Sequence, residues 1–78
     1  MNKQRRKRLS DIISQLEELQ CELQSIAEEE RECYDNMSET GLGESERGQQ
    51  ISENADDLES ADSDFESLLD NLREIQER

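Results

Sequence analysis

Apolar residues recur in two stretches of the chain at alternating steps of three and four residues. This spacing gathers side chains on one side of an α-helix and is typical of a helix packed against another helix. The first stretch consists of Leu9, Ile12, Leu16, Leu19, Leu23, Ile26, Glu30, Cys33 and Met37, and the second of Ile51, Asn54, Leu58, Ala61, Phe65, Leu68, Leu72 and Ile75. The pattern therefore predicts two amphipathic helices.

The two stretches match one another when the chain folds back near Leu42. Eight pairs of residues then face each other, and in each pair the residue numbers sum to 84. Leu42 is flanked by Gly41 and Gly43, and Gly41 is expected in the left-handed conformation that ends many helices. Asn2 is the expected N-cap of the first helix, and Thr40 or Gly43 that of the second. A single turn is therefore expected to join two antiparallel helices.

The sequence predicts one all-α domain over residues 1–78. No proline occurs in the chain and no glycine precedes position 41, so nothing interrupts a long first helix. We expect helices over about 3–37 and 44–77, joined by a turn over about 38–43. The expected fold is an antiparallel two-helix hairpin that resembles a coiled coil.

A second, weaker apolar strip runs beside the first at the next heptad positions. Its facing pairs, whose residue numbers sum to 82, are Ile13 with Leu69, Gln20 with Asp62 and Ala27 with Ala55. Only 29% of the residues are hydrophobic, with one Phe, one Tyr and no Trp, so a lone hairpin has little core. We therefore expect Ile13, Ala27, Ala55 and Leu69 to form an oligomer face, through which hairpins dimerise into a four-helix bundle.

Charge is distributed unevenly along the chain, which carries a formal net charge of −13. Residues 1–8 hold +5, whereas 9–37 hold −8, 38–48 hold −2 and 49–78 hold −8. A basic tip thus adjoins an acidic rod. The rod disfavours phosphate backbones and membrane surfaces and suits a basic partner. We expect no membrane association and no nucleic-acid binding along the rod.

Five cations crowd the first two turns of the first helix, where the helix dipole disfavours positive charge. They are Lys3, Arg5, Arg6, Lys7 and Arg8. One interpretation is an anion site for nucleic acid or for a nucleotide phosphate. The other is structural, because the hairpin brings this run beside Asp70, Glu74 and Glu77 and the last free carbonyls of the second helix. The sequence alone leaves both interpretations open.

A varied set of polar residues flanks the turn. Tyr34, Asp35 and Asn36 precede it, and Ser45 and Arg47 follow it. One interpretation is a hydrogen-bonded plug in which Arg47 contacts Asp35. The other requires a dimer of antiparallel hairpins, in which one turn lies near the basic tip of the other copy and the two form a composite anion pocket. These residues are therefore candidates for ligand or partner binding.

Residues typical of catalytic and metal sites are scarce. There is no His, and Glu29, Glu30 and Asp62 place too few carboxylates on one layer to bind a metal. No nucleophile lies beside a base, and no phosphate-binding loop occurs. We therefore expect no enzymatic activity, no metal and no cofactor.

The two cysteines lie too far apart to bond with each other. On one helix, Cys21 and Cys33 are separated by roughly 18 Å, beyond the Cα limit of ~7 Å for a disulfide, so both are expected to be reduced. The chain contains neither a secretory segment nor an apolar run of spanning length. These features predict a soluble, cytoplasmic protein.

Three short motifs mark the start of the chain and the two sides of the turn. They are Met1–Lys7 (MNKQRRK), Asp35–Met37 (DNM) and Ser45–Arg47 (SER). Together they resemble a group of small acidic helical-hairpin proteins from bacteriophages and prophages, in which a proline stands in place of Ser38. The resemblance extends over the whole chain. It implies a mobile-element origin and a non-enzymatic binding role against a host system, in the cytoplasm of a bacterial host.

The expected function is that of a phage-type binding protein that inhibits or sequesters a host component, either a host defence protein or a nucleotide signal. One alternative is a structural helical module for assembly. Another is an acidic mimic of nucleic acid, whose outer carboxylates imitate a phosphate backbone. A third is weak nucleic-acid binding through the basic N-terminus.

Overall fold

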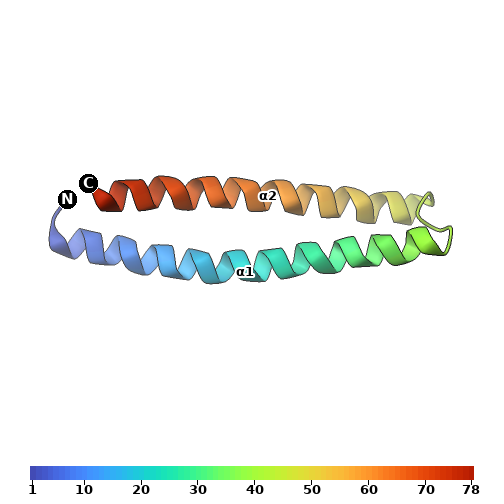
Figure 1. The fold of residues 1–78 in the computed structure, drawn as a ribbon, viewed down its shortest axis with the longest axis horizontal. Coiled ribbons are helices and arrows are strands. Elements are labelled where there is room, and N and C mark those ends of the chain that lie inside the picture. Colours follow the sequence, from blue (N-terminus) through green and yellow to red (C-terminus); the bar gives the residue numbers. More distant parts are fainter.

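The computed structural model describes residues 1–78 and contains two long helices. Helix α1 spans Lys3–Glu39 and helix α2 spans Glu46–Glu77. The two helices lie antiparallel along their whole length, with both termini at one end and the turn at the other (Figure 1). The predicted all-α hairpin is confirmed. Neither helix carries an apolar stretch long enough to cross a membrane.

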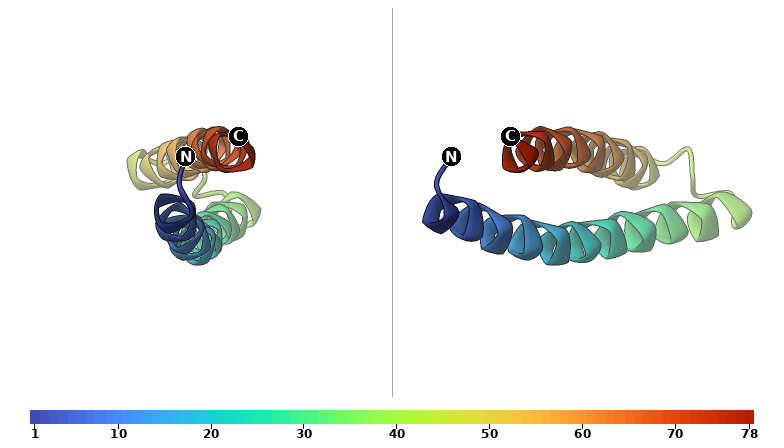
Figure 2. Two further views of the ribbon diagram at one scale, coloured as in Figure 1. Left: turned by 90° about the vertical axis from the view of Figure 1, so that its left-hand side faces the viewer. Right: turned by 60° about the vertical axis from the view of Figure 1, so that its left-hand side comes forward.

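The molecule is a thin rod of 57 × 15 × 14 Å, measured on its Cα atoms. Seen along its long axis, it is a single pair of helices that coil gently around each other, with no third element over either side (Figure 2). Each helix therefore has one side against its neighbour, and the remainder of its circumference is open. Only eight of the 78 residues are buried.

The ends of α1 follow the sequence prediction closely. The side chain of Asn2 accepts a hydrogen bond from the backbone N–H of Arg5 at 2.9 Å, as expected of an N-cap. The helix ends two residues later than predicted, at Glu39. Gly41 follows with a φ of +82°, in the left-handed region expected of it. The Leu42 N–H then donates to the Met37 carbonyl at 2.8 Å and reverses the chain.

The start of α2 differs from the prediction because Ser45, rather than Thr40 or Gly43, is its N-cap. The Ser45 hydroxyl accepts from the Gly48 N–H at 3.0 Å and donates to the Leu42 carbonyl at 2.6 Å. It thereby ties the first turn of α2 to the connecting segment, and the helix begins at Glu46 instead of at about residue 44.

Gly48 allows that first turn of α2 to lie directly against the connecting segment. A Cβ placed on Gly48 would lie 2.6 Å from the carbonyl oxygens of both Leu42 and Gly43. No side chain fits at that distance from backbone atoms. The closed end of the hairpin therefore requires glycine at this position.

Two predicted polar pairs confirm the register of the hairpin. The Asn54 side-chain amide donates to Glu30 at 3.4 Å, and the Gln20 amide donates to Asp62 at 3.3 Å. Gln20 also donates to Glu66 at 2.7 Å, so this buried amide is satisfied by two carboxylates. Polar groups at these facing positions are therefore paired across the two helices.

The line of closest contact between the helices corrects the predicted oligomer face. Ile13, Ala27, Ala55 and Leu69 were expected on an outer edge, but together with Ile51 of the predicted seam they are the buried apolar residues of the hairpin, and Ala55 and Leu69 are completely buried. The small Ala27 and Ala55 lie at matching heights and let the helices approach closely. Compared with the predicted seam, each helix is rotated about its own axis toward this line. These four residues are therefore not available to a second copy.

Candidate interaction surfaces

The rotation of the helices leaves a second set of apolar residues on the outside. They were expected at the centre of the seam, but their exposed fractions range from 37% to 51%, and they are Ile12, Leu19, Ile26, Leu68 and Ile75. The exposed Cys33, Asn54 and Ala61 continue the same two rows, at steps of seven residues, toward the turn. We call these eight residues the open face.

Both rows of the open face lie on the same side of the hairpin. The row on α1 and the row on α2 each repeat every seven residues, and each precedes the buried core residues by one position, as Ile12 precedes Ile13 and Leu68 precedes Leu69. Because the helices are antiparallel, equivalent rotations about their axes point toward the same side of the pair. The open face is therefore one continuous strip, and each of its rows extends over roughly 32 Å of the 57 Å rod.

Arginines close the opposite side of the hairpin, which we call the paired face. Arg31 of α1 contacts Asp56 at 2.7 Å and Glu59 at 3.1 Å, and Arg73 of α2 contacts Glu17 at 3.1 Å. The hydrogen bond to Asp56, followed by that to Glu59, raises the pKa of Arg31 above its ordinary value. The hydrogen bond to Glu17 raises the pKa of Arg73 in the same way. Both cations are therefore committed to contacts between the helices.

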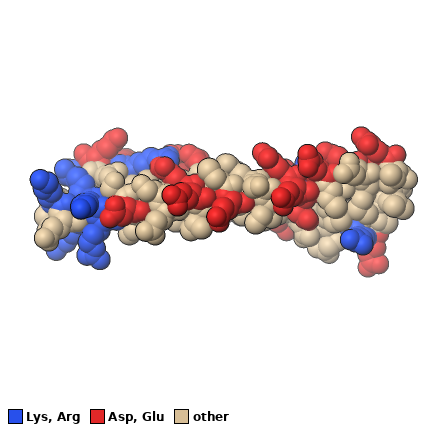
Figure 3. Space-filling model, turned by 90° about the horizontal axis from the view of Figure 1, so that it is seen from below, with Lys and Arg blue, Asp and Glu red and all other residues tan.

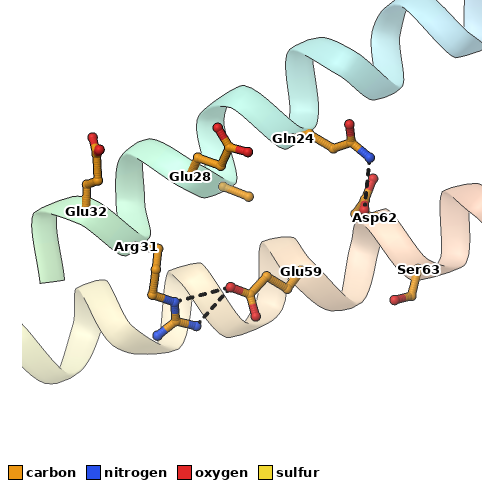
Figure 4. A pocket seen from close by; sticks show the side chains of 8 residues that line it. Gln24, Glu28, Arg31, Glu32, Glu59, Asp62 and Ser63 are labelled. Carbon is orange, nitrogen blue, oxygen red and sulfur yellow. Dashed lines mark hydrogen bonds and ion pairs between the residues drawn. The ribbon is translucent and has the colours of Figure 1, made fainter. Parts of the chain in front are cut away.

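An open depression of about 760 Å³ lies along the paired face. Its lining consists of Gln24, Ala27, Glu28, Arg31, Glu32, Glu59, Asp62 and Ser63. In Figure 4, Arg31 and Glu59 bridge it at one end, and Gln24 reaches Asp62 at the other. Its carboxylates outnumber its one cation, which is already paired. No group of three possible metal ligands converges here or elsewhere in the chain.

The basic tip is an unpaired cluster of cations. All five of its side chains, Lys3, Arg5, Arg6, Lys7 and Arg8, are exposed, and none lies within 4.0 Å of a carboxylate oxygen, whereas Arg31 and Arg73 do. The tip forms no ion pair with Asp70, Glu74 or Glu77 at the end of α2, and Asp70 instead contacts Arg73 at 3.3 Å. Figure 3 shows most of the Lys and Arg side chains gathered at the end with the termini, and Asp and Glu spread over the rest of the rod among a few further basic side chains.

The polar residues around the turn are only partly brought together. Ser45 caps α2, Tyr34 is half-buried, and Asp35 and Asn36 are exposed. Arg47 lies at an open depression of about 590 Å³ beside Cys33 and Asn54, and it forms no ion pair, so the predicted Arg47–Asp35 contact is absent.

The turn and the basic tip lie at opposite ends of the rod (Figure 1). A single chain therefore cannot join them in one pocket. The composite anion pocket remains a prediction that needs a second copy.

Two residues with structural roles were not identified from the sequence. Ser45 is a residue type strongly preferred at helix N-caps, and its position three residues before Gly48 was a usable signal. The requirement for glycine at position 48 depends on how closely α2 approaches the turn, which no local pattern reports.

The fold and its surfaces define an all-α helical hairpin with one long apolar face and one long ion-paired face. The chain matches no protein-family model, no curated protein and no solved structure. Function is therefore inferred from the surfaces themselves.

Proposed function

We propose that this chain is a non-enzymatic, phage-type binding protein that inhibits or sequesters a host component in the bacterial cytoplasm. The single observation that carries the proposal is the acidic surface of the rod, which holds a formal charge of −8 over residues 9–37 and again over residues 49–78. The open face supports self-association, because large exposed apolar patches on a small protein mark interaction sites. The open depressions along the rod offer no enclosed volume that would exclude water from a substrate.

The proposed binding unit is a homodimer in which two open faces meet and form a four-helix bundle. Burying the open face in this way leaves the carboxylates of both copies outside. That outer surface is strongly acidic and suits a host defence protein with a basic surface, by electrostatic complementarity.

The test uses full-length protein as bait in bacterial lysate, followed by purification of the captured protein and calorimetric titration. The variant removes three exposed carboxylates of the rod that form no ion pair: Glu18→Gln, Glu28→Gln and Glu32→Gln. The matched control removes three carboxylates near the ends: Glu44→Gln, Glu74→Gln and Glu77→Gln. We expect the rod variant to lose at least about tenfold in affinity, equivalent to ~1.4 kcal/mol, and the control to lose little. Equal binding by both would contradict docking through the rod.

A nucleotide signal is the second candidate host component, favoured by the unpaired cations of the basic tip. Phosphates bind well to clustered Arg side chains. A thermal-shift series with cyclic and linear nucleotides tests this, since a ligand at 100 times its dissociation constant adds ~2.7 kcal/mol of stability. Replacing Lys3, Arg5, Arg6, Lys7 and Arg8 by Gln should abolish the shift. No shift with any nucleotide for the unmodified chain would remove this candidate.

A further inference from the structure

A small depression lies where the open face approaches the two termini. It has a volume of about 290 Å³, and its lining consists of Met1, Arg5, Arg8, Leu9 and Ile12. We call it the tip depression. The depressions that contain Arg31, Arg47 and Leu58 each include at least two carboxylates, whereas the tip depression includes none. In a chain with 22 acidic and 9 basic residues, a depression whose only charged groups are cations is exceptional.

Helix periodicity explains why only two of the five tip cations line this depression. Arg5 and Arg8 are three residues apart, and Ile12 follows Arg5 by seven residues, so the three side chains lie along one side of α1. Lys3 and Lys7 are also one turn apart, but at about 100° per residue they lie on roughly the opposite side of the helix. The row of Ile12 therefore ends in a pair of arginines.

Both guanidinium groups of the tip depression are free to bind a ligand. Arg5 and Arg8 are exposed, and every ion pair of the folded chain involves Arg31 or Arg73 instead. Side chains three residues apart on a helix have Cβ atoms about 5–6 Å apart. Arg5 and Arg8 can therefore donate hydrogen bonds to one anion that lies between them.

Two neighbouring guanidinium groups favour an anion with more than two free oxygens. A carboxylate has two oxygens, and one guanidinium satisfies both through a bidentate pair of hydrogen bonds. The phosphate of a monoester has three free oxygens and carries a charge of about −1.5 to −2 at neutral pH, so it can accept from both arginines. The phosphate of a cyclic diester has two free oxygens and a smaller charge. The arginine pair therefore favours a phosphate monoester.

The other three lining residues form an apolar wall beside the arginines. Met1 and Ile12 are 52% and 49% exposed, and Leu9 is half-buried. Covering apolar side chains of this kind is favourable because it removes their surface from water. The tip depression therefore favours a phosphate that carries an organic group over a bare phosphate ion.

We infer that the tip depression binds a phosphate monoester, with its phosphate on Arg5 and Arg8 and its organic group against Leu9 and Ile12. This inference rests on the proposed sequestration of a nucleotide signal and narrows that candidate to linear nucleotides with a terminal phosphate. An alkyl phosphate has the same chemistry, so the test includes both sources of the monoester.

Calorimetric titration of the full-length chain with matched ligands tests the inference. The ligands are adenosine monophosphate, cyclic adenosine monophosphate, hexyl phosphate and inorganic phosphate. We expect adenosine monophosphate to bind at least about tenfold more tightly than the cyclic nucleotide or inorganic phosphate. Hexyl phosphate should also bind more tightly than inorganic phosphate, because it has the same phosphate and an apolar chain.

The outcomes of these titrations distinguish the inference from the proposed function. Equal binding of the linear and cyclic nucleotides would overturn the inference and leave the nucleotide candidate in place. Binding of hexyl phosphate but of neither nucleotide would support the inference and remove the nucleotide candidate. Binding of none of the four ligands would overturn the inference, and docking of a basic host protein on the acidic rod would be unaffected.

Two matched pairs of substitutions separate direct contact from general attraction. Arg5→Gln with Arg8→Gln removes both guanidinium groups of the tip depression, and Lys3→Gln with Lys7→Gln removes the same charge from the other side of α1. Because long-range attraction falls equally in both variants, the difference between them reports direct contact. We expect the arginine pair to weaken binding of adenosine monophosphate about tenfold or more, and the lysine pair about two- to threefold. Equal losses would overturn the inference.

Ile12→Ser tests the apolar wall, and Leu19→Ser is its matched control one heptad further along the same row. The two residues are 49% and 51% exposed, so both substitutions should have similar effects on stability and on self-association. Only Ile12→Ser should weaken binding of adenosine monophosphate, by about threefold or more, and it should leave binding of inorganic phosphate unchanged. Equal effects of the two substitutions on nucleotide binding would show that the organic group does not lie in the tip depression and would overturn the inference.

Discussion

The paired face and the open face belong to the same two helices and the same heptad repeat, yet they have opposite chemistry. On the paired face, Arg31 and Arg73 each reach across to carboxylates of the other helix. On the open face, Ile12, Leu19 and Ile26 project about half-exposed beside their counterparts on α2. The paired face is thus closed by contacts between the two helices of one chain, whereas the apolar side chains of the open face remain exposed.

The positions that hold the hairpin together therefore differ from those that are open to association, whereas in a heptad repeat the same positions usually have both roles. The core line of Ile13, Ala27, Ala55 and Leu69 with the paired face holds one chain together as a hairpin. The open face, whose large side chains are about half-exposed, contributes less to that hairpin and has its full effect only when something covers it. A stripe of three apolar positions in seven is what a four-helix bundle needs, and it is wider than two helices require.

The largest expected effect comes from adjacent leucines that fall on different sides of this division. Leu69 is completely buried, whereas Leu68 is 46% exposed. Leu69→Ala should lower the free energy of unfolding by about 2–5 kcal/mol at every protein concentration. Leu68→Ala should have a smaller effect that grows with concentration as copies associate. Chemical denaturation followed by circular dichroism at several concentrations measures both. Equal losses at high dilution would show that the two leucines are not separated in this way.

The second prediction tests the corrected role of the small residues in the core line. Ala27→Leu should lower the free energy of unfolding by roughly 1–3 kcal/mol, because the added atoms push the helices apart. If Ala27 were on an oligomer face, the same change would instead strengthen association. Ile26→Leu is the matched control on the open face and should leave the hairpin nearly unchanged. Thermal unfolding together with sedimentation distinguishes the two results.

The sequence was sufficient for the hairpin because the apolar periodicity and the single glycine-rich break indicate the same fold-back of the chain. Eight facing pairs agreed on one register, and the Glu30–Asn54 and Gln20–Asp62 hydrogen bonds follow it. A shift of one helix by a heptad would still bring apolar positions together, so the place of the glycine-flanked turn at Leu42 was what fixed the register. Register and direction were therefore predictable from the residues alone.

The rotation of each helix about its axis was not predictable in the same way. Rotating the seam by one heptad position exchanges Ile12 for Ile13 and Leu68 for Leu69, and both members of each pair are apolar. Which of them is buried depends on how closely the backbones approach, and this is set by the small Ala27 and Ala55. Hydrophobicity patterns contain no such distance, so the oligomer face was assigned to the wrong edge.

The candidate site was predictable as a set of residues but not as an arrangement. The basic run was identified from its position against the helix dipole. Whether the basic tip forms an ion pair depends on where the Asp70 side chain points, and the Asp70 carboxylate contacts Arg73. Side-chain partners of this kind follow from the rotation of the helices and were therefore beyond the sequence pattern.

The third prediction concerns the turn end of the hairpin, which joins the two helices that carry both faces. Ser45→Ala removes the hydroxyl that accepts from the Gly48 N–H and should cost about 1 kcal/mol of unfolding free energy. Ser45→Asp restores an acceptor at the same position and should recover most of that loss. Because the cap lies outside both faces, the dimer dissociation constant should not change beyond the effect on folding. A change in association without a change in stability would place Ser45 in a binding site instead.

The smallest expected effect is on the paired face. Arg31→Gln removes two exposed ion pairs, and such pairs contribute little in water and are screened by salt. Because the pKa of Arg31 is raised in the folded chain, its contribution to stability is fully present at and below its ordinary pKa and is lost only as the pH rises through the raised pKa. Salt concentration is therefore the useful variable. We expect Arg31→Gln to lower the melting temperature slightly at about 0.01 M ionic strength and not at about 1 M, where the Debye length falls to ~3 Å. Leu68→Ala should show the opposite trend, because salt does not screen apolar contacts. A lower melting temperature for Arg31→Gln that persists at high salt would indicate that the arginine acts through packing of its side chain. The two faces would then differ in side-chain packing as well as in charge.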